Sequence, residues 1–335
     1  MIYRKQKDFD NFKCIADKCP KSCCIGWQIM IDEDSLEKYA ATSGDFGYRL
    51  KSSINYQEGS FIQNNTRCSM LNETGLCDLQ STLGEKYLCN TCRRYPRHTE
   101  EFQDIREYSL SLSCPEAVRM IMEPSYSFSI EESEDDIYDN PDAFEDFDFI
   151  LFDKLVYARE QMIKLAKDSS IPLSDRLEKI RSAALSLQNL FDEGDIFGMD
   201  DISYDEKNPI SHNYSVDGLN MLLSLEVLEE SWHDSIKKTI SFWNNNSSFD
   251  FDKDTEFIFE KVFESLLFNY FCGAVYDGQI YARAMIAVMS VLWLMMIYTA
   301  HPNSSLAETI YLYSREVEHS DTNVNTLITY FENEL

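Results

Sequence analysis

Residues 173–191 have the sequence LSDRLEKIRSAALSLQNLF, in which apolar side chains recur at alternating steps of four and three residues. The apolar positions are Leu173, Leu177, Ile180, Ala184, Leu187 and Phe191. Residues at these steps share one face of an α-helix, because the helix has about 3.6 residues per turn. Asp175 and Lys179 form an i, i+4 pair of opposite charge outside that face. We therefore predict an amphipathic helix that buries one side in a helical core.

The same kind of pattern recurs through the second part of the chain. A second apolar stripe covers residues 259–271, and further helix patterns lie near residues 149–163, 219–227 and 306–317. Cys272 follows the second stripe directly, so we expect a buried hydrophobic cysteine and not a metal ligand there. These helices predict a bundle core and imply no chemistry by themselves.

Residues 284–300 are apolar and carry no charge. A membrane-spanning helix needs about 20 such residues, and Lys and Arg usually cluster beside it. This segment is shorter and has no basic cluster at its ends. We therefore predict a helix buried at the centre of the bundle, and no membrane association.

The chain is strongly acidic, with a net charge of −28 over its 335 residues. Nucleic-acid binding depends on Lys and Arg that neutralise phosphates, so we expect no nucleic-acid partner. The charge is uneven, because residues 1–119 have a net charge of −1 and residues 120–335 carry the remaining −27. The first residues lack the apolar core of a secretion signal, and we expect a cytoplasmic protein.

Ten of the eighteen residues from Glu131 to Asp148 are acidic, and Pro141 interrupts them. Such a run is typical of a solvated linker. We predict a cysteine-rich domain over residues 1–125, an acidic linker over residues 126–142 and a helical domain over residues 143–335. The fold class is then mainly α: an irregular, metal-binding N-terminal domain with little β structure, followed by an acidic helical bundle.

Nine of the ten cysteines lie in the first 114 residues. They are Cys14, Cys19, Cys23, Cys24, Cys68, Cys77, Cys89, Cys92 and Cys114. In a reducing cytoplasm such a group favours a metal site over disulfides, and an odd total argues against complete pairing. We predict that these nine thiols supply the ligands of a metal centre. Nine thiols suffice for one cluster with spares or for two four-ligand zinc sites, and the sequence leaves both open.

Local sequence patterns predict which secondary-structure elements carry some of these thiols. Thr82 and Glu85 have capping-box spacing, which predicts a helix from residue 82 that ends before Pro96 and carries Cys89 and Cys92 on one face. Two thiols on one helical turn can chelate a single iron or zinc ion. Neighbouring cations are expected to lower the thiol pKa values; they are Arg93, Arg94 and Arg97.

The flanking cysteines are less regular. Cys23 and Cys24 are adjacent and cannot easily both bind one ion, so one of them is expected to serve another site or none. Residues 109–114 alternate as in a strand that ends at Cys114, and Pro115 is well placed to begin a helix.

Taken together, the cysteine motifs resemble a known family. They run Phe12-Lys13-Cys14-x4-Cys19-x3-Cys23-Cys24-Ile25-Gly26-Trp27, then Arg67-Cys68-Ser69-Met70-Leu71-Asn72-Glu73-x-Gly75-Leu76-Cys77-Asp78, then Leu83-Gly84-Glu85-x-Tyr87-Leu88-Cys89-x2-Cys92-Arg93-x-Tyr95-Pro96-Arg97, and then Ser113-Cys114-Pro115-Glu116-Ala117. Over residues 9–120 this order resembles the flagellin lysine-N-methylases. It is also similar, more distantly, to cysteine-rich domains that chelate zinc or iron.

The resemblance implies transfer of a methyl group from S-adenosylmethionine to lysine ε-amines of flagellin. It also implies that the cysteines hold an iron–sulfur cluster of the [4Fe–4S] type, with zinc as the alternative. The chain has neither a G-x-G-x-x-G motif nor the C-x3-C-x2-C spacing of radical enzymes that use the same methyl donor. We therefore expect a polar methyl transfer.

The sequence assigns no catalytic base, no methyl-donor site and no oligomeric state. Trp27, Tyr87 and Tyr95 are near the cysteines and could hold a cation through their rings, although core packing is the favoured role for each. Two other functions stay open. One is a non-catalytic zinc domain fused to a helical bundle that binds a partner, and the other is a redox protein that uses its cluster for electron transfer.

Overall fold

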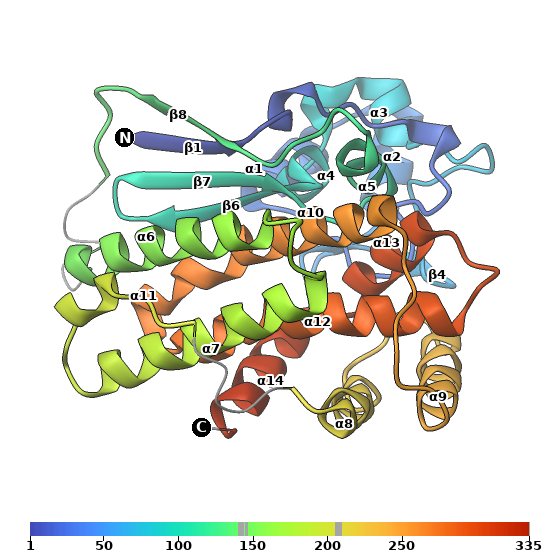
Figure 1. The fold of residues 1–335 in the computed structure, drawn as a ribbon. Coiled ribbons are helices and arrows are strands. Elements are labelled where there is room, and N and C mark those ends of the chain that lie inside the picture. The colour runs from blue at the N-terminus through green and yellow to red at the C-terminus, as the bar shows by residue number, and fades with distance from the viewer. Residues whose placement is uncertain (140–143, 145–146, 205–209, 335) are drawn as a thin grey trace.

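Helix α12 (Ile280–Ala300) is the central helix of the structure, a computed structural model that describes residues 1–139, 144, 147–204 and 210–334 (Figure 1). The helices that contact α12 are α7 (Leu173–Asp192), α8 (His212–Leu222), α9 (Ser231–Trp243), α10 (Lys253–Tyr270), α13 (Leu306–Glu316) and α14 (Asp321–Glu332). By length and composition alone α12 could cross a membrane, but 94% of its apolar window is buried inside the protein. The apolar composition of α12 is therefore explained by its position in the core, where all sides of the helix are apolar and buried.

The helices of the second half confirm the predicted mainly α class. In α7 the predicted face is buried at Leu177, Ile180, Ala184 and Leu187, while Phe191 is only partly buried. Helix α6 (Phe149–Ala166) covers the predicted pattern near residues 149–163, and α10 and α13 cover two others. The pattern near residues 219–227 is only partly helical, because α8 ends at Leu222. Cys272 is buried, as predicted.

A four-stranded sheet lies against these helices. Its order is β6 (Arg97–Phe102), β7 (Ile105–Leu110), β1 (Ile2–Gln6) and β8 (Ile130–Glu134). Strands β1 and β7 are parallel, and the other neighbours are antiparallel. The predicted strand over residues 109–114 is wrong, because β7 ends at Leu110 and the chain then turns, with the Cys114 amide donating to the Ser111 carbonyl. Strand β8 lies inside the segment predicted as an acidic linker, part of which falls outside the described residues.

The cysteine-rich part consists of short elements around a hydrophobic cluster of its own. Its helices are α1 (Glu33–Ala41), α2 (Gly44–Ser52), α3 (Asp78–Leu83), α4 (Asn90–Arg94) and α5 (Pro115–Met122). Two hairpins pair β2 (Ile54–Asn55) with β3 (Ser60–Phe61) and β4 (Gln63–Asn64) with β5 (Arg67–Cys68). Short helical turns complete the chain at Phe9–Asn11, Ala16–Lys18, Glu85–Tyr87, Phe197–Asp200, Phe271–Gly273 and Ala274–Asp277.

The helix predicted from residue 82 to before Pro96 is wrong. Gly84 has a φ of 85°, which ends α3 at Leu83, and the next α-helix begins only at Asn90. The helix predicted after Pro115 is confirmed as α5, with Cys114 at its N-cap position. Helix α5 contacts both α10 and α13, and this contact brings Cys114 to the helical half of the molecule.

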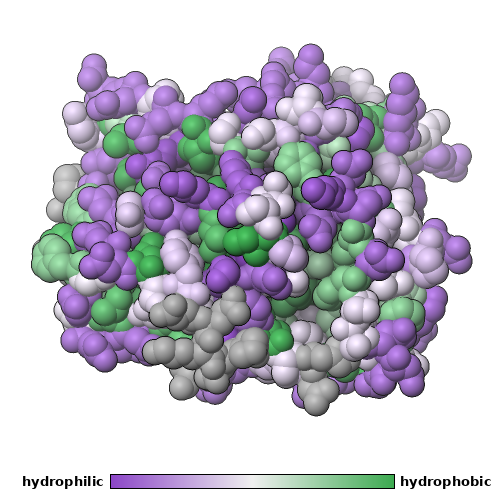
Figure 2. Space-filling view, in the orientation of Figure 1, coloured by the Kyte–Doolittle hydropathy of each residue, from purple (hydrophilic) through white to green (hydrophobic). Residues whose placement is uncertain are grey.

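Hydrophilic residues cover most of the face shown in Figure 2, and the hydrophobic residues on it form small separate groups. This surface agrees with the acidic composition. The coloured residues of this view form no broad apolar patch.

Candidate metal centre and a neighbouring acidic pocket

The nine N-terminal cysteines are all free thiols, and they gather in two neighbourhoods. The outer thiol group consists of Cys14, Cys19, Cys23 and Cys114. The inner thiol group consists of Cys24, Cys68, Cys77, Cys89 and Cys92. The division follows the packing, since the inner thiols belong to or contact one hydrophobic cluster and Cys114 belongs to another.

The inner thiol group is assembled by the β4–β5 hairpin. The Cys68 amide donates to the Cys24 carbonyl at 2.9 Å, and an isolated bridge pairs Ile25 with Arg67. Cys68 and Cys89 are buried, and burial raises the pKa of Cys68 to about 12. A second bridge pairs Leu71 with Cys77 and closes the loop before α3. Chain segments far apart in sequence thus bring their thiols to one place.

Cys89 and Cys92 form a pair at the start of α4. Cys89 is the N-cap residue and Cys92 lies in the first turn, so the two thiols meet although no single helix carries both. A hydrogen bond from the Cys92 thiol lowers the pKa of Cys89, and the same bond raises the pKa of Cys92. The Cys89 sulfur also lies 3.6 Å from the Met30 carbonyl, to which it donates as a thiol.

The outer thiol group lies between the chain start and α5. Cys114 is buried in a cluster with Phe9, Phe12 and Ala117, and burial raises the pKa of its thiol to about 11. Charges at Cys19 and Cys14 contribute to the same shift, and charges at Cys14 and Cys114 contribute to the raised pKa of Cys23. The four thiols are therefore within electrostatic reach of one another.

The adjacent residues Cys23 and Cys24 join the two groups. A hydrogen bond from the Cys23 thiol lowers the pKa of Cys24 to about 7, with Ser22 and Arg67 acting in the same direction. The same hydrogen bond, together with burial, raises the pKa of Cys23. Cys23 is within electrostatic reach of both groups, because its charge also contributes to the raised pKa of Cys92.

The donor chemistry of these groups fits a metal that prefers sulfur, such as zinc or the iron of a cluster. As the side chains stand, however, no three His, Cys, Asp or Glu groups in the described part of the chain have an arrangement that could hold a metal ion. The Cys89 thiol instead donates to the Met30 carbonyl at 3.6 Å, and the Cys19 thiol donates to the Lys21 carbonyl at 3.3 Å. The ligand assignment of the nine cysteines therefore stays a prediction.

The cations beside the thiols differ from those predicted. Arg93 and Arg94 are exposed, and Arg97 lies over the rings of Phe9 and Phe12 at 5.8 and 5.2 Å. The cations among the main causes of the thiol pKa shifts are Arg67 at Cys24 and Arg315 at Cys19. Sequence reasoning missed Arg315 because it lies in α13, far along the chain and in no motif.

Aromatic side chains surround Arg315 where the two halves meet. The Arg315 guanidinium lies 4.0 Å above the Trp27 ring, and the ring centroids of Trp27 and His319 are 3.8 Å apart. Tyr95 also contacts both of these rings. Tyr87 is elsewhere, beside Lys38 and Lys86. Trp27 thus faces a cation supplied by the protein itself.

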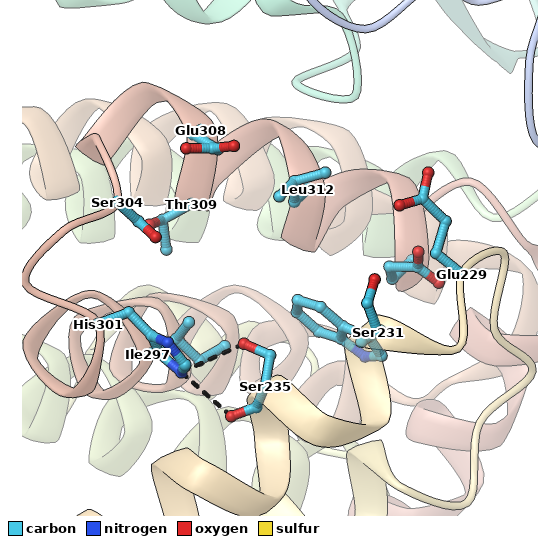
Figure 3. A pocket seen from close by; sticks show the side chains of 11 residues that line it. Glu229, Ser231, Ser235, Ile297, His301, Ser304, Glu308, Thr309 and Leu312 are labelled. Carbon is cyan, nitrogen blue, oxygen red and sulfur yellow. Dashed lines mark hydrogen bonds between the residues drawn. The ribbon is translucent and has the colours of Figure 1, made fainter.

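A small pocket opens on another face of α13, between α9, α12 and α13 (Figure 3). Its volume is about 100 Å³. Its lining residues are Glu229, Ser231, Trp232, Ser235, Ile297, His301, Ser304, Glu308, Thr309, Leu312 and Glu316. Three carboxyl groups beside a tryptophan make an acidic site with an aromatic wall, which is suited to a cation.

Two groups in this pocket have shifted pKa values. Burial raises the pKa of Glu316 to about 7, although its carboxylate accepts the Leu228 amide at 2.7 Å. Burial also lowers the pKa of His301, whose Nε2 lies 3.2 Å from the Ser235 hydroxyl (Figure 3). Glu316 can therefore gain or release a proton near neutral pH.

Glu229 connects the acidic pocket to the cysteines. Its carboxylate forms an ion pair with Lys21, which lies between Cys19 and Cys23 in the chain. The pocket and the outer thiol group are thus linked through one ion pair as well as through α13.

Comparison with known proteins adds independent information. The family described as "FliB lysine N-methylase C-terminal domain" matches residues 159–335. The lysine-N-methylases of Salmonella choleraesuis (strain SC-B67) and Salmonella typhimurium are each 31% identical over 132 residues, which are 36% of this chain and 33% of each relative. The flagellar biosynthetic protein FliU of Salmonella muenchen is 33% identical over 122 residues, which are 33% of this chain and 72% of that protein. The aligned segment thus spans a third of the length of the two lysine-N-methylases, and no solved structure matches the chain.

Proposed function

Because this chain belongs to the family that carries the FliB lysine N-methylase C-terminal domain, we propose that it transfers methyl groups from S-adenosylmethionine to lysine ε-amines of flagellin. The observation that carries the proposal is the family match over residues 159–335, a range that contains the whole acidic pocket. The names of the relatives, two lysine-N-methylases and a flagellar biosynthetic protein, support the reaction and the flagellar substrate.

The proposal includes a metal–thiolate centre on the nine cysteines, a [4Fe–4S] cluster or zinc. The support is the presence of nine free thiols in four separate cysteine-bearing stretches of the chain. Such a centre, when bound, cross-links segments that few secondary-structure contacts hold together, and so contributes directly to folding. The reduced thiols that it needs agree with a cytoplasmic location.

The acidic pocket is proposed to receive the cationic groups of the reaction. A lysine ammonium and the sulfonium of the methyl donor are both positively charged, and both are attracted to an aromatic face and to carboxylates. Trp232 supplies the face and Glu308 supplies charge, while the Glu229 carboxylate is already paired with Lys21. The main contribution of the site is then to position the lysine amine for attack on the methyl carbon.

The methyl transfer also needs a neutral amine, whereas lysine has an ordinary pKa of about 10.4. Glu316 is the proposed acceptor of the lysine proton, since the pKa of its carboxyl is raised to about 7. The amine lone pair then forms the new N–C bond while the S–C bond breaks and its electron pair stays on sulfur. The transfer is polar and uses no radical.

The test is mass spectrometry of flagellin after incubation with the protein and S-adenosylmethionine whose methyl group carries an isotopic label. We expect labelled methyl groups on lysine, and a rate lowered at least about 100-fold in Glu316→Gln, the size typical of losing a general base. Glu230→Gln is the matched control, because Glu230 is exposed next to the pocket residue Glu229. Flagellin that stays unlabelled with metal-loaded protein contradicts the proposal.

A non-catalytic zinc domain joined to a partner-binding bundle is the second candidate function. One observation favours it: the pocket volume of about 100 Å³ is below the roughly 300 Å³ at which small-molecule sites usually begin. It predicts bound zinc, no turnover and no binding of S-adenosylmethionine.

A further inference from the structure

Asn323 is an almost completely buried amide near the start of α14, with an exposed fraction of 1%. Its side chain forms three hydrogen bonds, all with backbone groups. The Oδ1 atom accepts the Glu226 amide at 2.9 Å, and Nδ2 donates to the Glu226 carbonyl at 2.9 Å and to the Glu316 carbonyl at 2.8 Å. One side chain therefore connects two segments of the backbone that are far apart in sequence.

The first of these segments borders the acidic pocket. It consists of residues 223–230, which connect α8 to α9, and we call it the pocket loop. Figure 3 shows Glu229 of this loop at one end of the pocket. The Leu228 amide donates to the Glu316 carboxylate at 2.7 Å, and the Glu229 amide also donates to that carboxylate. The pocket loop thus holds the group that we propose as the proton acceptor.

The second segment is the end of α13, which carries Glu316 itself. Both ends of the hydrogen bond between Leu228 and Glu316 are therefore tied to Asn323, one through the pocket loop and the other through the Glu316 carbonyl. Asn323 is also fixed by its own backbone, because the Ser320 hydroxyl caps α14 and accepts the Asn323 amide at 3.2 Å. The three elements form one hydrogen-bonded unit.

The pocket loop gains little of its position here from side-chain burial. Glu226 is exposed, and residues 227–229 are only partly buried. Since burial of apolar side chains is the main force that fixes a loop against a core, the hydrogen bonds to Asn323 are important for the order of this stretch.

We propose that Asn323 is a positioning residue, which acts through Glu316 by holding the pocket loop and the end of α13 in the arrangement that aims the Glu316 carboxylate at the reacting amine. Asn323 is not among the described residues that line the pocket, so we assign it no contact with the substrate. The inference rests on the proposed role of Glu316 as the acceptor of the lysine proton.

The test is the rate of flagellin methylation by Asn323→Ala with isotopically labelled S-adenosylmethionine. We expect kcat to fall about 10- to 100-fold, because a catalytic group misplaced by about 1 Å can cost about 100-fold in rate. Asn325→Ala is the matched control, since Asn325 is an exposed residue of the same type on the same helix, and its kcat should equal that of wild type. An unchanged kcat in Asn323→Ala overturns the inference.

A double variant shows whether Asn323 acts through Glu316. In the Glu316→Gln background the proton acceptor is already lost, so we expect Asn323→Ala to lower kcat little further. If the full loss recurs in this background, Asn323 acts only on general stability and the inference is wrong. Wild-type protein that leaves flagellin unlabelled overturns the proposed function and, with it, this role of Asn323.

Hydrogen exchange of the Leu228 amide tests the position of the pocket loop without any reaction. We expect this amide to exchange at least about 10-fold faster in Asn323→Ala, because the released loop opens more often, and amides of α12 to keep their wild-type rates. Equal acceleration in α12 shows a merely structural role and contradicts the proposal. Ser320→Ala weakens the cap beside Asn323 and should accelerate Leu228 exchange to a smaller extent in a folded protein. Leu228 exchange at the wild-type rate in both variants overturns the inference.

Discussion

Arg159 and Glu107 form a two-fold hydrogen-bonded ion pair between the bundle and the sheet. Nη1 and Nη2 of Arg159 in α6 donate to the two carboxylate oxygens of Glu107 in β7 at 2.6 and 2.5 Å. Both side chains are buried, and Nη1 also donates to the Phe268 carbonyl in α10 at 3.1 Å. The pair therefore fixes the sheet to two helices of the bundle at once.

We expect Glu107→Gln to lower the free energy of unfolding by about 3–5 kcal/mol, because it leaves the buried guanidinium of Arg159 without its counter-ion. Urea unfolding measures this. The double variant Glu107→Leu/Arg159→Met is expected to lose less than the single variant, since neither charge remains. Glu132→Gln is the control: it breaks an exposed pair with Arg4 and is expected to cost about 1 kcal/mol or less. If the double variant loses as much stability as Glu107→Leu and Arg159→Met lose together when measured singly, the two side chains are not coupled.

Glu264 in α10 predicts a pH dependence of stability. Burial raises the pKa of its carboxyl from 4.5 to about 8, although Lys167 Nζ lies 3.4 Å from it. The folded state holds this proton more tightly than the unfolded state, so the contribution to stability is complete below about pH 4.5 and is lost as the pH rises to about 8. We expect Glu264→Gln to be more stable than wild type at pH 9 and close to it at pH 4.5. Glu160→Gln changes an exposed position and should leave the wild-type dependence of stability on pH unchanged. If Glu264→Gln also shows the wild-type dependence, Glu264 is not the group responsible for it.

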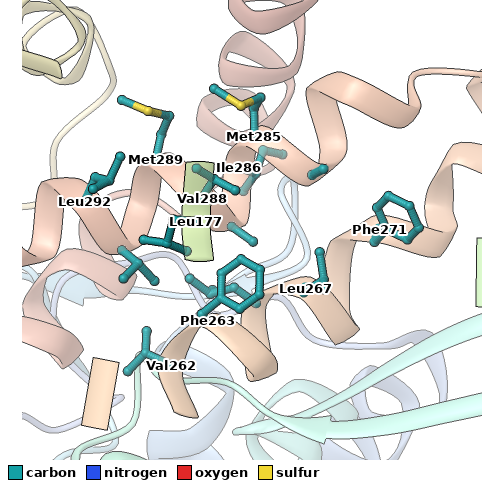
Figure 4. Packing of buried hydrophobic residues seen from close by; sticks show 14 of the residues in the cluster. Leu177, Val262, Phe263, Leu267, Phe271, Met285, Ile286, Val288, Met289 and Leu292 are labelled. Carbon is teal, nitrogen blue, oxygen red and sulfur yellow. The ribbon is translucent and has the colours of Figure 1, made fainter. Parts of the chain in front are cut away.

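Phe263 in α10 is completely buried in the cluster that contains Leu177 and Val288 (Figure 4). Replacing it with alanine removes most of a ring from a closely packed core. We expect Phe263→Ala to cost about 3–5 kcal/mol in unfolding free energy. Phe257 lies on the same helix, but its side chain is 41% exposed. Phe257→Ala removes the same atoms and should lower the unfolding free energy much less. Similar costs for the two variants would contradict the assigned packing.

The paired thiols predict which cysteines matter for metal binding. We expect Cys89→Ser and Cys92→Ser to lose metal from the inner thiol group, because each substitution removes one member of a pair at the start of α4. Cys272→Ala is the control, since Cys272 is buried in the bundle core and is expected to leave the metal content unchanged. The measurement is the metal content of each purified variant. Full metal content in Cys89→Ser and Cys92→Ser removes both residues from the centre.

The helices could be predicted from the sequence because their signal is local. Apolar residues at helical steps marked α7 and α10, and a charge-free run marked α12. The sheet carried no such signal: β8 has the sequence IEESE, with a single apolar residue, and it pairs with β1 at the other end of the cysteine-rich half. Gly84 broke a helix that the capping pattern predicted, because its left-handed conformation is set by the surrounding turn.

The sequence predicts metal-ligating cysteines, but it does not predict how the folded chain groups them or which cation lies beside them. Spacing shows that Cys89 and Cys92 are neighbours, whereas the division between the two thiol groups depends on the β4–β5 hairpin and on α5. Arg315 lies 290 residues after Ile25, to which it donates a hydrogen bond. Only the packing of α13 against α5 brings that charge to the thiols.

We propose that the cysteines form a metal–thiolate centre in a lysine methyltransferase. The most direct measurement is the iron, sulfide and zinc content of protein purified without oxygen, together with its visible absorption spectrum. We expect a brown protein with iron and sulfide in near-stoichiometric amounts. Zinc alone in a colourless protein would favour the zinc-domain alternative, and protein with neither metal would contradict the claim.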